Sequence, residues 1–244
     1  MIGKPFIILS SVDSTNNHAM QLIRNGEARH GTTIFALEQT QGKGQRGRSW
    51  ESNSGENIML SVIIDAKQHK LLEQFAFSAT IALGCHDFFS HFAGDETTIK
   101  WPNDLYWRDR KAGGMLIENI LSEGNWKWSV IGVGININQT DFQTLQNRPV
   151  SLKQITGKHF DTIDLARELC ACLEKRFMQL ITHSTENIVV DYNEHLFKKG
   201  QLVKFKKGQV VFEATVSKVN DHGALEIEHG FTDTVRHGEV EWLL

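Results

Sequence analysis

Short apolar runs alternate with amphipathic stretches along the chain as far as residue 137. Runs rich in β-branched and aromatic residues predict strands, and apolar positions at helical spacing predict helices. The predicted strands are residues 6–9, 32–38, 57–65, 97–101, 114–121 and 127–137. The predicted helices are residues 13–24 and 70–92, the second with an apolar stripe of Leu71, Leu72, Phe75, Ala79, Ala82 and Leu83. This order predicts an α+β fold, with a mixed, mostly antiparallel sheet and helices on one face.

The pattern changes after residue 160. Two further helices are predicted at residues 163–180 and 186–196. From residue 199 onward, short β-prone runs are separated by Gly200, Gly208, Gly223, Gly230 and Gly238. The chain is therefore expected to form two abutting domains: residues 1–198, and a small barrel-like β domain of about five strands at residues 199–244.

Composition excludes several classes of protein. Of 244 residues, 40% are hydrophobic and 23% charged, as in folded globular proteins and unlike disordered chains, coiled coils or fibres. The net charge of −3 gives no whole-protein argument for binding nucleic acid. No stretch approaches the roughly 20 apolar residues that span a bilayer, and the N-terminal apolar run is too short for a signal peptide. We expect a cytoplasmic protein that does not bind membranes.

The three cysteines give no sign of a disulfide framework or a metal site. Cys85, Cys170 and Cys172 lie in apolar helical stretches, and their spacing matches no metal-ligand motif. We expect all three to be small core residues.

A glycine-rich basic loop, residues 39–50, is the most informative segment. Its glycines allow backbone amides to approach an anion closely. Lys43, Arg46 and Arg48 add cationic donors suited to phosphate or carboxylate groups. The loop matches neither the Walker A spacing nor G-x-G-x-x-G. A solvated basic loop without a ligand is the alternative.

Two later segments also carry polar residues at strand ends. Pro102 and Asn103 predict a turn directly after a strand, and Lys111 precedes Gly113 and Gly114 at the start of another. An ammonium group there is suited to bound anions, although a surface hairpin with a charged tip is an alternative. The stretch from Gly132 to Asn138 offers small glycines and amides to a base or sugar, or forms a bulged strand end.

Together these segments closely resemble the biotin protein ligase family. GKGQRGRSW corresponds to the family's GRGRRGRxW loop, KWPNDLYW to its KWPND block, RKAGGMLIE to its K-x-x-G-I/M-L-x-E block and GVGININ to its G-x-G-x-N block. Ser14-Thr15-Asn16 matches the family's STN. All five motifs occur in family order. The related lipoate ligases share the fold but have a different loop and lack KWPND.

The resemblance implies a class II synthetase-like catalytic domain of the biotin/lipoate ligase fold and an SH3-like C-terminal barrel. It implies an enzyme that converts biotin and ATP to biotinyl-5′-AMP and pyrophosphate. The enzyme then transfers biotin to one lysine of a biotin carboxyl carrier protein domain of a carboxylase. ATP and biotin are the expected substrates, with Mg²⁺ as a metal ion whose protein ligands the sequence does not identify. Because a carboxylate must meet a triphosphate, cationic donors are required.

The resemblance also assigns site residues. Lys111 is expected to bridge the biotin carboxylate and the α-phosphate, Arg48 to hold phosphate, and Asp104 to orient the incoming lysine or help to place Mg²⁺. Biotin is expected to contact Ser14, Thr15, Asn16, Gln39, Gly42, Lys43, Gly44, Gln45, Trp50, Lys111, Gly113 and Gly114. ATP is expected to contact Arg46, Arg48, Lys100, Trp101, Asn103 and Asn136, with Asn136 facing the adenine. Ser14 and Thr15 are also suited to helix capping, and Trp50 to a place in the core.

Two departures from the family pattern change the expectations. Lys43 and Gln45 stand where the family commonly has arginine, and the arginine at the position of Gln45 helps to hold the adenylate. Either Arg46 and Lys43 compensate, or the intermediate is held less tightly. Because STN begins at residue 14, there is no room before it for the DNA-binding domain of some members, so we expect no DNA partner.

Two alternative functions remain. One is lipoate or octanoyl transfer to a carrier lysine on the same fold, which the loop and KWPND oppose. The other is a biotin-binding regulator without catalysis. A homodimer formed by pairing of sheet edges is also compatible with the family.

Overall fold

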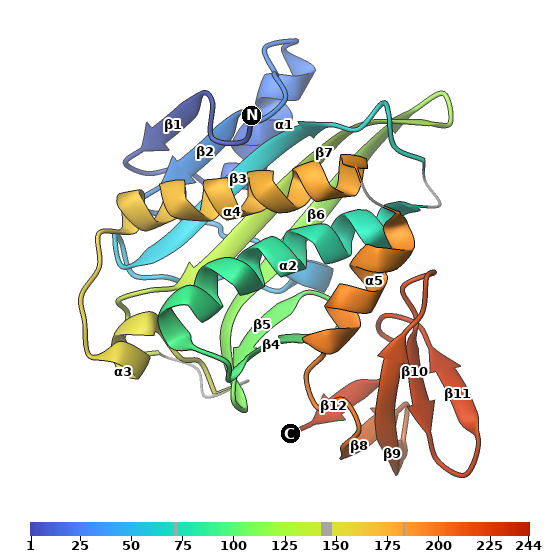
Figure 1. Ribbon diagram of the computed structural model, residues 1–244. Coiled ribbons are helices and arrows are strands. Elements are labelled where there is room, and N and C mark those ends of the chain that lie inside the picture. The colour runs from blue at the N-terminus through green and yellow to red at the C-terminus, as the bar shows by residue number, and fades with distance from the viewer. Residues whose placement is uncertain (71–72, 143–147, 183) are drawn as a thin grey trace.

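A seven-stranded sheet forms the centre of the larger part of the protein (Figure 1). The structure is a computed structural model that describes residues 1–70, 73–142, 148–182 and 184–244. The strands run in the order β1-β2-β3-β7-β6-β5-β4. Their bounds are β1 Phe6–Leu9, β2 Thr33–Ala36, β3 Asn57–Asp65, β4 Thr97–Lys100, β5 Asp104–Trp107, β6 Arg110–Ser122 and β7 Asn125–Asn136. Only the β1–β2 pair is parallel among these neighbours, which confirms the predicted mixed, mostly antiparallel sheet.

Strand β5 was not predicted, and β6 begins at Arg110 and not at residue 114 as predicted. The four residues of β5 follow the turn at Pro102 and Asn103 and pair with β4 on one side and β6 on the other. The β5–β6 hairpin turns at Arg108 and Asp109. The hairpin with a charged tip, considered above as an alternative, therefore exists, and the same hairpin carries both Asp104 and Lys111.

Five α-helices lie among the described residues. They are α1 Thr15–Arg24, α2 Gln74–Ala93, α3 Leu152–Thr156, α4 Thr162–Thr182 and α5 Thr185–Glu194. Helix α2 begins later than predicted, and Leu71 and Leu72 of the predicted stripe lie outside the described residues. The short helix α3 was not predicted, although Ser151 and Gln154 form a capping box and Gly157 ends it in the left-handed conformation.

Helices cover both faces of the sheet, not one. The long helices α2 and α4 lie side by side over one face, where their apolar residues pack on Leu60, Val62 and Val133 (Figure 1). Helix α1 packs on the opposite face, where Ala19 meets Ile34, Ile63 and Val130. Because β3 is covered on both faces, its sequence is an almost continuous apolar run.

The cysteines belong to the core, as predicted. Cys85 and Cys170 are buried and Cys172 is partly buried, and all three are free thiols. Burial raises the pKa of Cys170 to about 11 and that of Cys85 further. Neither thiol is a reactive thiolate at neutral pH.

The C-terminal segment forms a separate five-stranded sheet, ordered β11-β10-β9-β8-β12. Its strands are β8 Leu202–Lys207, β9 Val210–Val219, β10 Leu225–Glu228, β11 Thr232–Val235 and β12 Glu241–Leu243. The number of strands agrees with the sequence pattern. A division of the chain at residue 198 stays a prediction.

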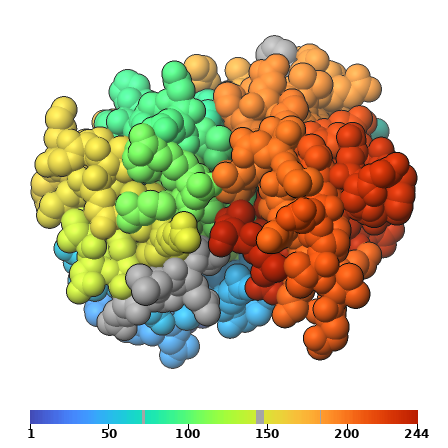
Figure 2. All heavy atoms as spheres, turned by 90° about the horizontal axis from the view of Figure 1, so that it is seen from below, coloured from blue at the N-terminus to red at the C-terminus, as the bar shows by residue number. Residues whose placement is uncertain are grey.

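This C-terminal sheet is docked on the rest of the protein through polar contacts as well as apolar ones. The Asn193 side chain of α5 donates a hydrogen bond to the carbonyl of Val219 and accepts one from its amide. The indole of Trp101 donates to the carbonyl of Gly223 at 3.0 Å. Figure 2 shows the C-terminal atoms, in orange and red, packed directly against the remainder of the molecule.

Candidate active site

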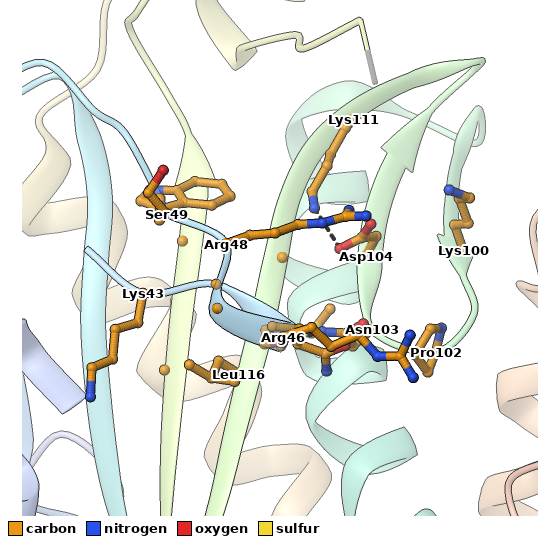
Figure 3. Close-up of a pocket in the computed structure, with 18 of the residues that line it drawn as sticks. Lys43, Arg46, Arg48, Ser49, Lys100, Pro102, Asn103, Asp104, Lys111 and Leu116 are labelled. Carbon is orange, nitrogen blue, oxygen red and sulfur yellow. Dashed lines mark hydrogen bonds and ion pairs between the residues drawn. The ribbon is translucent and has the colours of Figure 1, made fainter. Parts of the chain in front are cut away.

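A cavity of about 1030 Å³ opens between the loop after β2, strands β3, β6 and β7, and the C-terminal sheet. Most of the residues predicted from the motifs line it (Figure 3). They are Ser14, Thr15, Asn16, Gln39, Lys43, Gly44, Gln45, Arg46, Arg48, Trp50, Lys100, Trp101, Asn103, Asp104, Lys111, Gly114 and Asn136. Segments far apart in sequence thus meet in one concave site.

Gly42 and Gly113, two predicted biotin contacts, do not line the cavity. A Cβ added at Gly42 would lie 2.3 Å from the carbonyl oxygen of Trp50, and one at Gly113 would lie 2.7 Å from that of Gly134. Both glycines therefore allow two backbone segments to pass closely, which shapes the site without presenting atoms to a ligand.

One end of the cavity carries a chain of buried hydrogen bonds. The amide and the hydroxyl of Thr15 both donate to Oε1 of Gln39, at 2.7 and 3.0 Å. The Ser61 hydroxyl lies 2.7 Å from the Thr15 hydroxyl and 2.5 Å from Oδ1 of Asn16. The Asn16 amide donates to Glu118 at 2.7 Å. Ser14 is the N-cap residue of α1, but its hydroxyl makes no capping hydrogen bond.

This network of hydrogen bonds contains fewer donor hydrogens than acceptor positions. Ser61 has one hydroxyl proton and two acceptor oxygens within reach, so either Thr15 or Asn16 keeps acceptor capacity for another donor. Gln39 uses its carbonyl oxygen for Thr15, which leaves its amide N–H groups as the donors it can offer. This end of the cavity therefore presents both donors and acceptors to a ligand.

Two glycines of β7 make room for side chains at the cavity wall. A Cβ at Gly132 would lie 2.4 Å from Oδ1 of Asn16, and one at Gly134 would lie 2.5 Å from the Trp50 ring. The Trp50 indole N–H is buried and has no hydrogen-bond partner among the residues that the structure describes. The two glycines therefore allow the amide of Asn16 and the indole of Trp50 to pack against the sheet. Trp50 lines the cavity, so it is not only a core residue.

The other end of the cavity is cationic. The Lys111 ammonium forms an ion pair with Asp104 across the β5–β6 hairpin, with 2.6 Å between Nζ and Oδ1, and each side chain is about one fifth exposed. Arg48 extends toward the same pair in Figure 3. A Cβ at Gly114 would lie 3.1 Å from the Asp104 carboxylate and 3.4 Å from Lys111 Nζ, so the glycine keeps this corner open.

The three cations of the basic loop have different surroundings. The loop folds back on itself, since the Trp50 amide donates to the Gly42 carbonyl and the Gly44 amide to that of Arg48. Lys43 points away from Lys111 and donates to Asn17 of α1 (Figure 3). Arg46 donates to the carbonyls of His237 and Gly238 in the turn before β12. Arg48 is the loop cation directed at the Lys111–Asp104 corner.

The residues predicted to bind ATP differ in which of their polar atoms already form hydrogen bonds within the protein. Trp101 and Asn103 donate to backbone carbonyls, of Gly223 and Met115 respectively. Asn136 donates its amide hydrogens to the carbonyls of Val150 and Lys111, so its carbonyl oxygen is the atom directed to other partners. Burial lowers the pKa of Lys100; the negative charge of Asp104 opposes this shift, and the positive charges of Lys111 and Arg48 add to it.

The sequence model of the Biotin/lipoate A/B protein ligase family matches residues 8–136, which is more than half of the chain and includes the motifs described above except the last two residues of GVGININ. The chain belongs to this family. It is 30% identical over 233 residues to the bifunctional ligase/repressor BirA of Bacillus spizizenii, covering 93% of this chain and 70% of that protein. It is 26% identical over 239 residues to the biotin–[acetyl-CoA-carboxylase] ligase of Mycobacterium tuberculosis, covering 96% of this chain and 87% of that protein.

A solved biotin protein ligase shares its fold with nearly the whole chain. The structure is similar to the biotin protein ligase from Aquifex aeolicus in complex with biotin and ATP, with a TM-score of 0.81 and 24% sequence identity. The match covers 98% of this chain and 99% of that one. The C-terminal sheet is therefore part of the shared architecture, and the predicted α+β fold is confirmed.

Several residues of the site were not predicted from the family motifs. Ser61 is a polar residue inside the apolar run of β3, which is the sequence signal that could have found it. Glu118 closes the RKAGGMLIE block. The C-terminal sheet adds Lys206, Gly208 and residues 237–242 to the lining. No sequence pattern indicates these last residues, because their position depends on how the second sheet docks.

Among the described residues, every helix is too short or too polar to cross a lipid bilayer.

Proposed function

We propose that this chain is a biotin protein ligase that makes biotinyl-5′-AMP from biotin and ATP and transfers biotin to a lysine of a biotin carboxyl carrier protein. The observation that carries the proposal is the polarity of a single cavity. Paired donors and acceptors occupy one end, and the Lys111, Arg48 and Lys100 cations occupy the other. A ligand with a cyclic urea at one end and a carboxylate at the other fits both.

The urea ring of biotin matches the hydrogen-bonding chain. A urea carbonyl needs donors, and the amide of Gln39 supplies them. The ring N–H groups need acceptors, and the spare acceptor capacity of Thr15 or Asn16 supplies one. Lipoate has a dithiolane ring without such groups, so it would leave these buried polar atoms unpaired, which is costly. This contrast favours biotin over lipoate or octanoate.

The cationic end suits adenylation. A carboxylate oxygen attacks the α-phosphorus of ATP, a new P–O bond forms, and the bond to pyrophosphate breaks. Lys111 lies where it can neutralise both reacting groups, and Arg48 can grip phosphate oxygens with its fork of donors. Before substrate arrives, Asp104 satisfies the Lys111 ammonium. The oxygen of Asn136 is suited to accept the exocyclic N–H of adenine.

The site fits a magnesium ion that is held mainly by substrate. The described residues contain no group of three or more His, Cys, Asp or Glu side chains arranged to hold a metal. Mg²⁺ often uses only one or two carboxylates together with substrate phosphates, and Asp104 is the carboxylate beside the cations. Bound Mg²⁺ would supply charge neutralisation of the triphosphate.

Transfer requires that a carrier lysine reach the same cavity. Its amine attacks the carbonyl carbon of the adenylate, AMP leaves, and the amine loses a proton. Asp104 is positioned to orient this amine. The cytoplasm, where ATP is available, is the expected location. A homodimer stays a prediction: β1 is the open edge of the larger sheet, because β4 pairs with Leu196 on its outer side.

The test is isotope exchange between radiolabelled pyrophosphate and ATP, with biotin, lipoate or octanoate as the acid. We expect exchange with biotin alone, followed by labelling of a biotin carboxyl carrier domain. Exchange with lipoate or octanoate instead would assign the alternative transferase function. Biotin binding without exchange would assign the regulator function.

A further inference from the structure

Lys100 is held between aromatic rings that come from two different sheets. Its Nζ lies 5.1 Å from the centroid of the Tyr106 ring on β5 and 3.4 Å from the Tyr106 hydroxyl. The same Nζ lies 5.6 Å from the Trp242 ring on β12. Ring faces attract cations, and the attraction grows as water is excluded. The ammonium is thus fixed by one residue of its own sheet and one of the C-terminal sheet.

Trp242 is itself firmly placed. It pairs across the strands with Phe205 of β8, with ring centroids 4.9 Å apart, and lies 5.9 Å from Phe197. Phe197 in turn packs on Tyr106 at 4.9 Å. The aromatic side chains therefore form a continuous cradle around Lys100. The cradle links the C-terminal sheet to the strand that precedes the turn at Pro102.

Lys100 belongs electrostatically to the cationic end of the cavity. Asp104, Lys111, Arg48 and Glu241 are the charged groups that act on it, and both Lys100 and Trp242 line the cavity. A lysine stem has many rotamers, and a surface ammonium is strongly hydrated. The cradle removes both the freedom and the water, so that little reorganisation remains when a phosphate arrives.

We propose that Trp242 is a positioning residue of the nucleotide site, which acts by holding the Lys100 ammonium in place for ATP phosphate. The C-terminal sheet then completes the binding site and is not merely attached to it. This inference rests on the proposed function for the identity of the nucleotide. Its prediction is that Trp242 and Lys100 contribute to ATP binding as one unit.

The experiment measures binding of an ATP analogue with an α,β-methylene bridge by calorimetry in the presence of biotin, so that no reaction occurs. It compares the wild type, Trp242→Leu, Lys100→Met and the double variant. We expect Trp242→Leu to weaken binding about three- to thirtyfold and to have no further effect in the Lys100→Met background. Full additivity of the two changes, or unchanged binding by Trp242→Leu, would overturn the inference.

Two controls separate positioning from general loosening of the sheet. Phe212→Leu removes a ring that stacks on Phe205 at 5.9 Å but does not line the cavity, and it should bind the analogue as the wild type does. Equal weakening by Phe212→Leu would contradict the inference. Trp242→Phe keeps a ring face and should restore most of the affinity. If Trp242→Leu does not fold, Trp242→Met takes its place in the double-mutant cycle with Lys100→Met, and we expect the same weakening of analogue binding.

The proposed function is tested separately in the same preparations. Wild-type protein that binds the analogue but shows no biotin-dependent pyrophosphate exchange would refute the ligase assignment. The coupling between Trp242 and Lys100 would still be measured by the binding cycle. Failure of one proposal is therefore distinguishable from failure of the other.

Discussion

The guanidinium group of Arg46 lies directly on the backbone of Gly238. It donates hydrogen bonds to the carbonyls of His237 and Gly238, at 3.1 and 3.4 Å. A Cβ added at Gly238 would lie only 1.4 Å from Nη2 of Arg46. Arg46 has a left-handed backbone, with φ of 56°. The tip of the basic loop is thus attached to the turn before β12, across the mouth of the cavity.

We expect Gly238→Ala to release Arg46 and loosen the basic loop. The atoms that the new Cβ would meet are the end of a flexible side chain, so Arg46 can move away without unfolding the sheet. Loop closure over a reactive adenylate should weaken, and the dissociation rate of biotinyl-5′-AMP should rise several-fold. Stopped-flow measurement of adenylate release tests this.

Gly230→Ala is the matched control for this prediction. Gly230 also has a left-handed φ, of +90°, but no described atom lies within 4 Å of an added Cβ. Both substitutions should destabilise the protein by about 1 kcal/mol through backbone strain. Equal adenylate release from the two variants would show that strain, and not the Arg46 contact, is responsible.

Gln45→Arg should slow adenylate release. Lys43 and Arg46 are the two cations considered above as compensation for the neutral Gln45, and they are bound to Asn17 and to the turn before β12. The native loop is therefore expected to hold the adenylate weakly. A charged hydrogen bond contributes about 1.5–3 kcal/mol, or roughly ten- to a hundredfold in dissociation rate. As a control, Gln41→Arg adds the same charge outside the cavity lining and should leave the rate of adenylate release unchanged. If Gln45→Arg also releases the adenylate at the wild-type rate, the native loop already retains its intermediate and the prediction is wrong.

Much of the fold was predictable from local pattern. The first strand was predicted with its observed bounds, because FIIL is a compact β-prone run. Strand β5 was missed because four residues after a turn give too short a pattern to distinguish from a loop. Helix α1 was predicted, but the face of the sheet on which it packs was not. Ala19 packs beside Ile63 of β3, and periodicity alone does not show which face of the sheet a helix covers.

The site was predictable where motifs are contiguous and not where sheets meet. Lys111 and Asp104 are seven positions apart, and strand pairing brings them together. Trp242 and Gly238 lie more than 130 positions from Lys100 and almost 200 from Arg46, and no local signal connects them. The docking of the C-terminal sheet, through contacts such as Asn193 with Val219, creates these relationships.

Glu118→Leu should weaken biotin binding selectively. The Glu118 carboxylate fixes the amide of Asn16, which orients its oxygen toward Ser61. Without this partner the amide can turn over, and we expect the KM for biotin to rise about tenfold, since a hydrogen bond to a charged group contributes about 1.5–3 kcal/mol. Dethiobiotin, which keeps the urea ring, should be affected equally. Glu118→Gln can still accept from Asn16 and should retain more affinity; a change in the KM for ATP alone would contradict this role.

Stability should fall as the pH decreases from about 7 to about 5. Burial lowers the pKa of His30, His69 and His195, and the neighbouring His86 lowers that of His195 further. Since these pKa values are depressed in the folded state, the stabilisation is present above the ordinary histidine pKa of about 6.5 and is lost as the pH falls below it. Urea denaturation across this range checks the sign, and a flat profile would contradict it.

A second loss is expected in stronger acid. Burial alone raises the pKa of Asp87, but the nearby His86 ring and the hydrogen bonds and charge of Arg176 outweigh it and hold that pKa far below its usual value. Arg176 also binds Asp191, and the cluster joins α2, α4 and α5. Its stabilisation is present above the ordinary aspartate pKa of about 3.9 and is lost below it. Asp87→Asn should reduce this second loss and leave the first in place.

The central claim is that Lys111 and its neighbours allow one cavity to join a biotin carboxylate to the α-phosphate of ATP. The most direct measurement is single-turnover formation of biotinyl-5′-AMP from α-labelled ATP by the wild type and Lys111→Met. Lys67→Met, which removes an exposed lysine paired with Asp65 outside the cavity, is the control. We expect rapid adenylate formation by the wild type and the control, and formation about 10²–10³-fold slower by Lys111→Met, with a much smaller change in biotin affinity. A folded Lys111→Met protein that forms the adenylate as fast as the wild type would contradict the account.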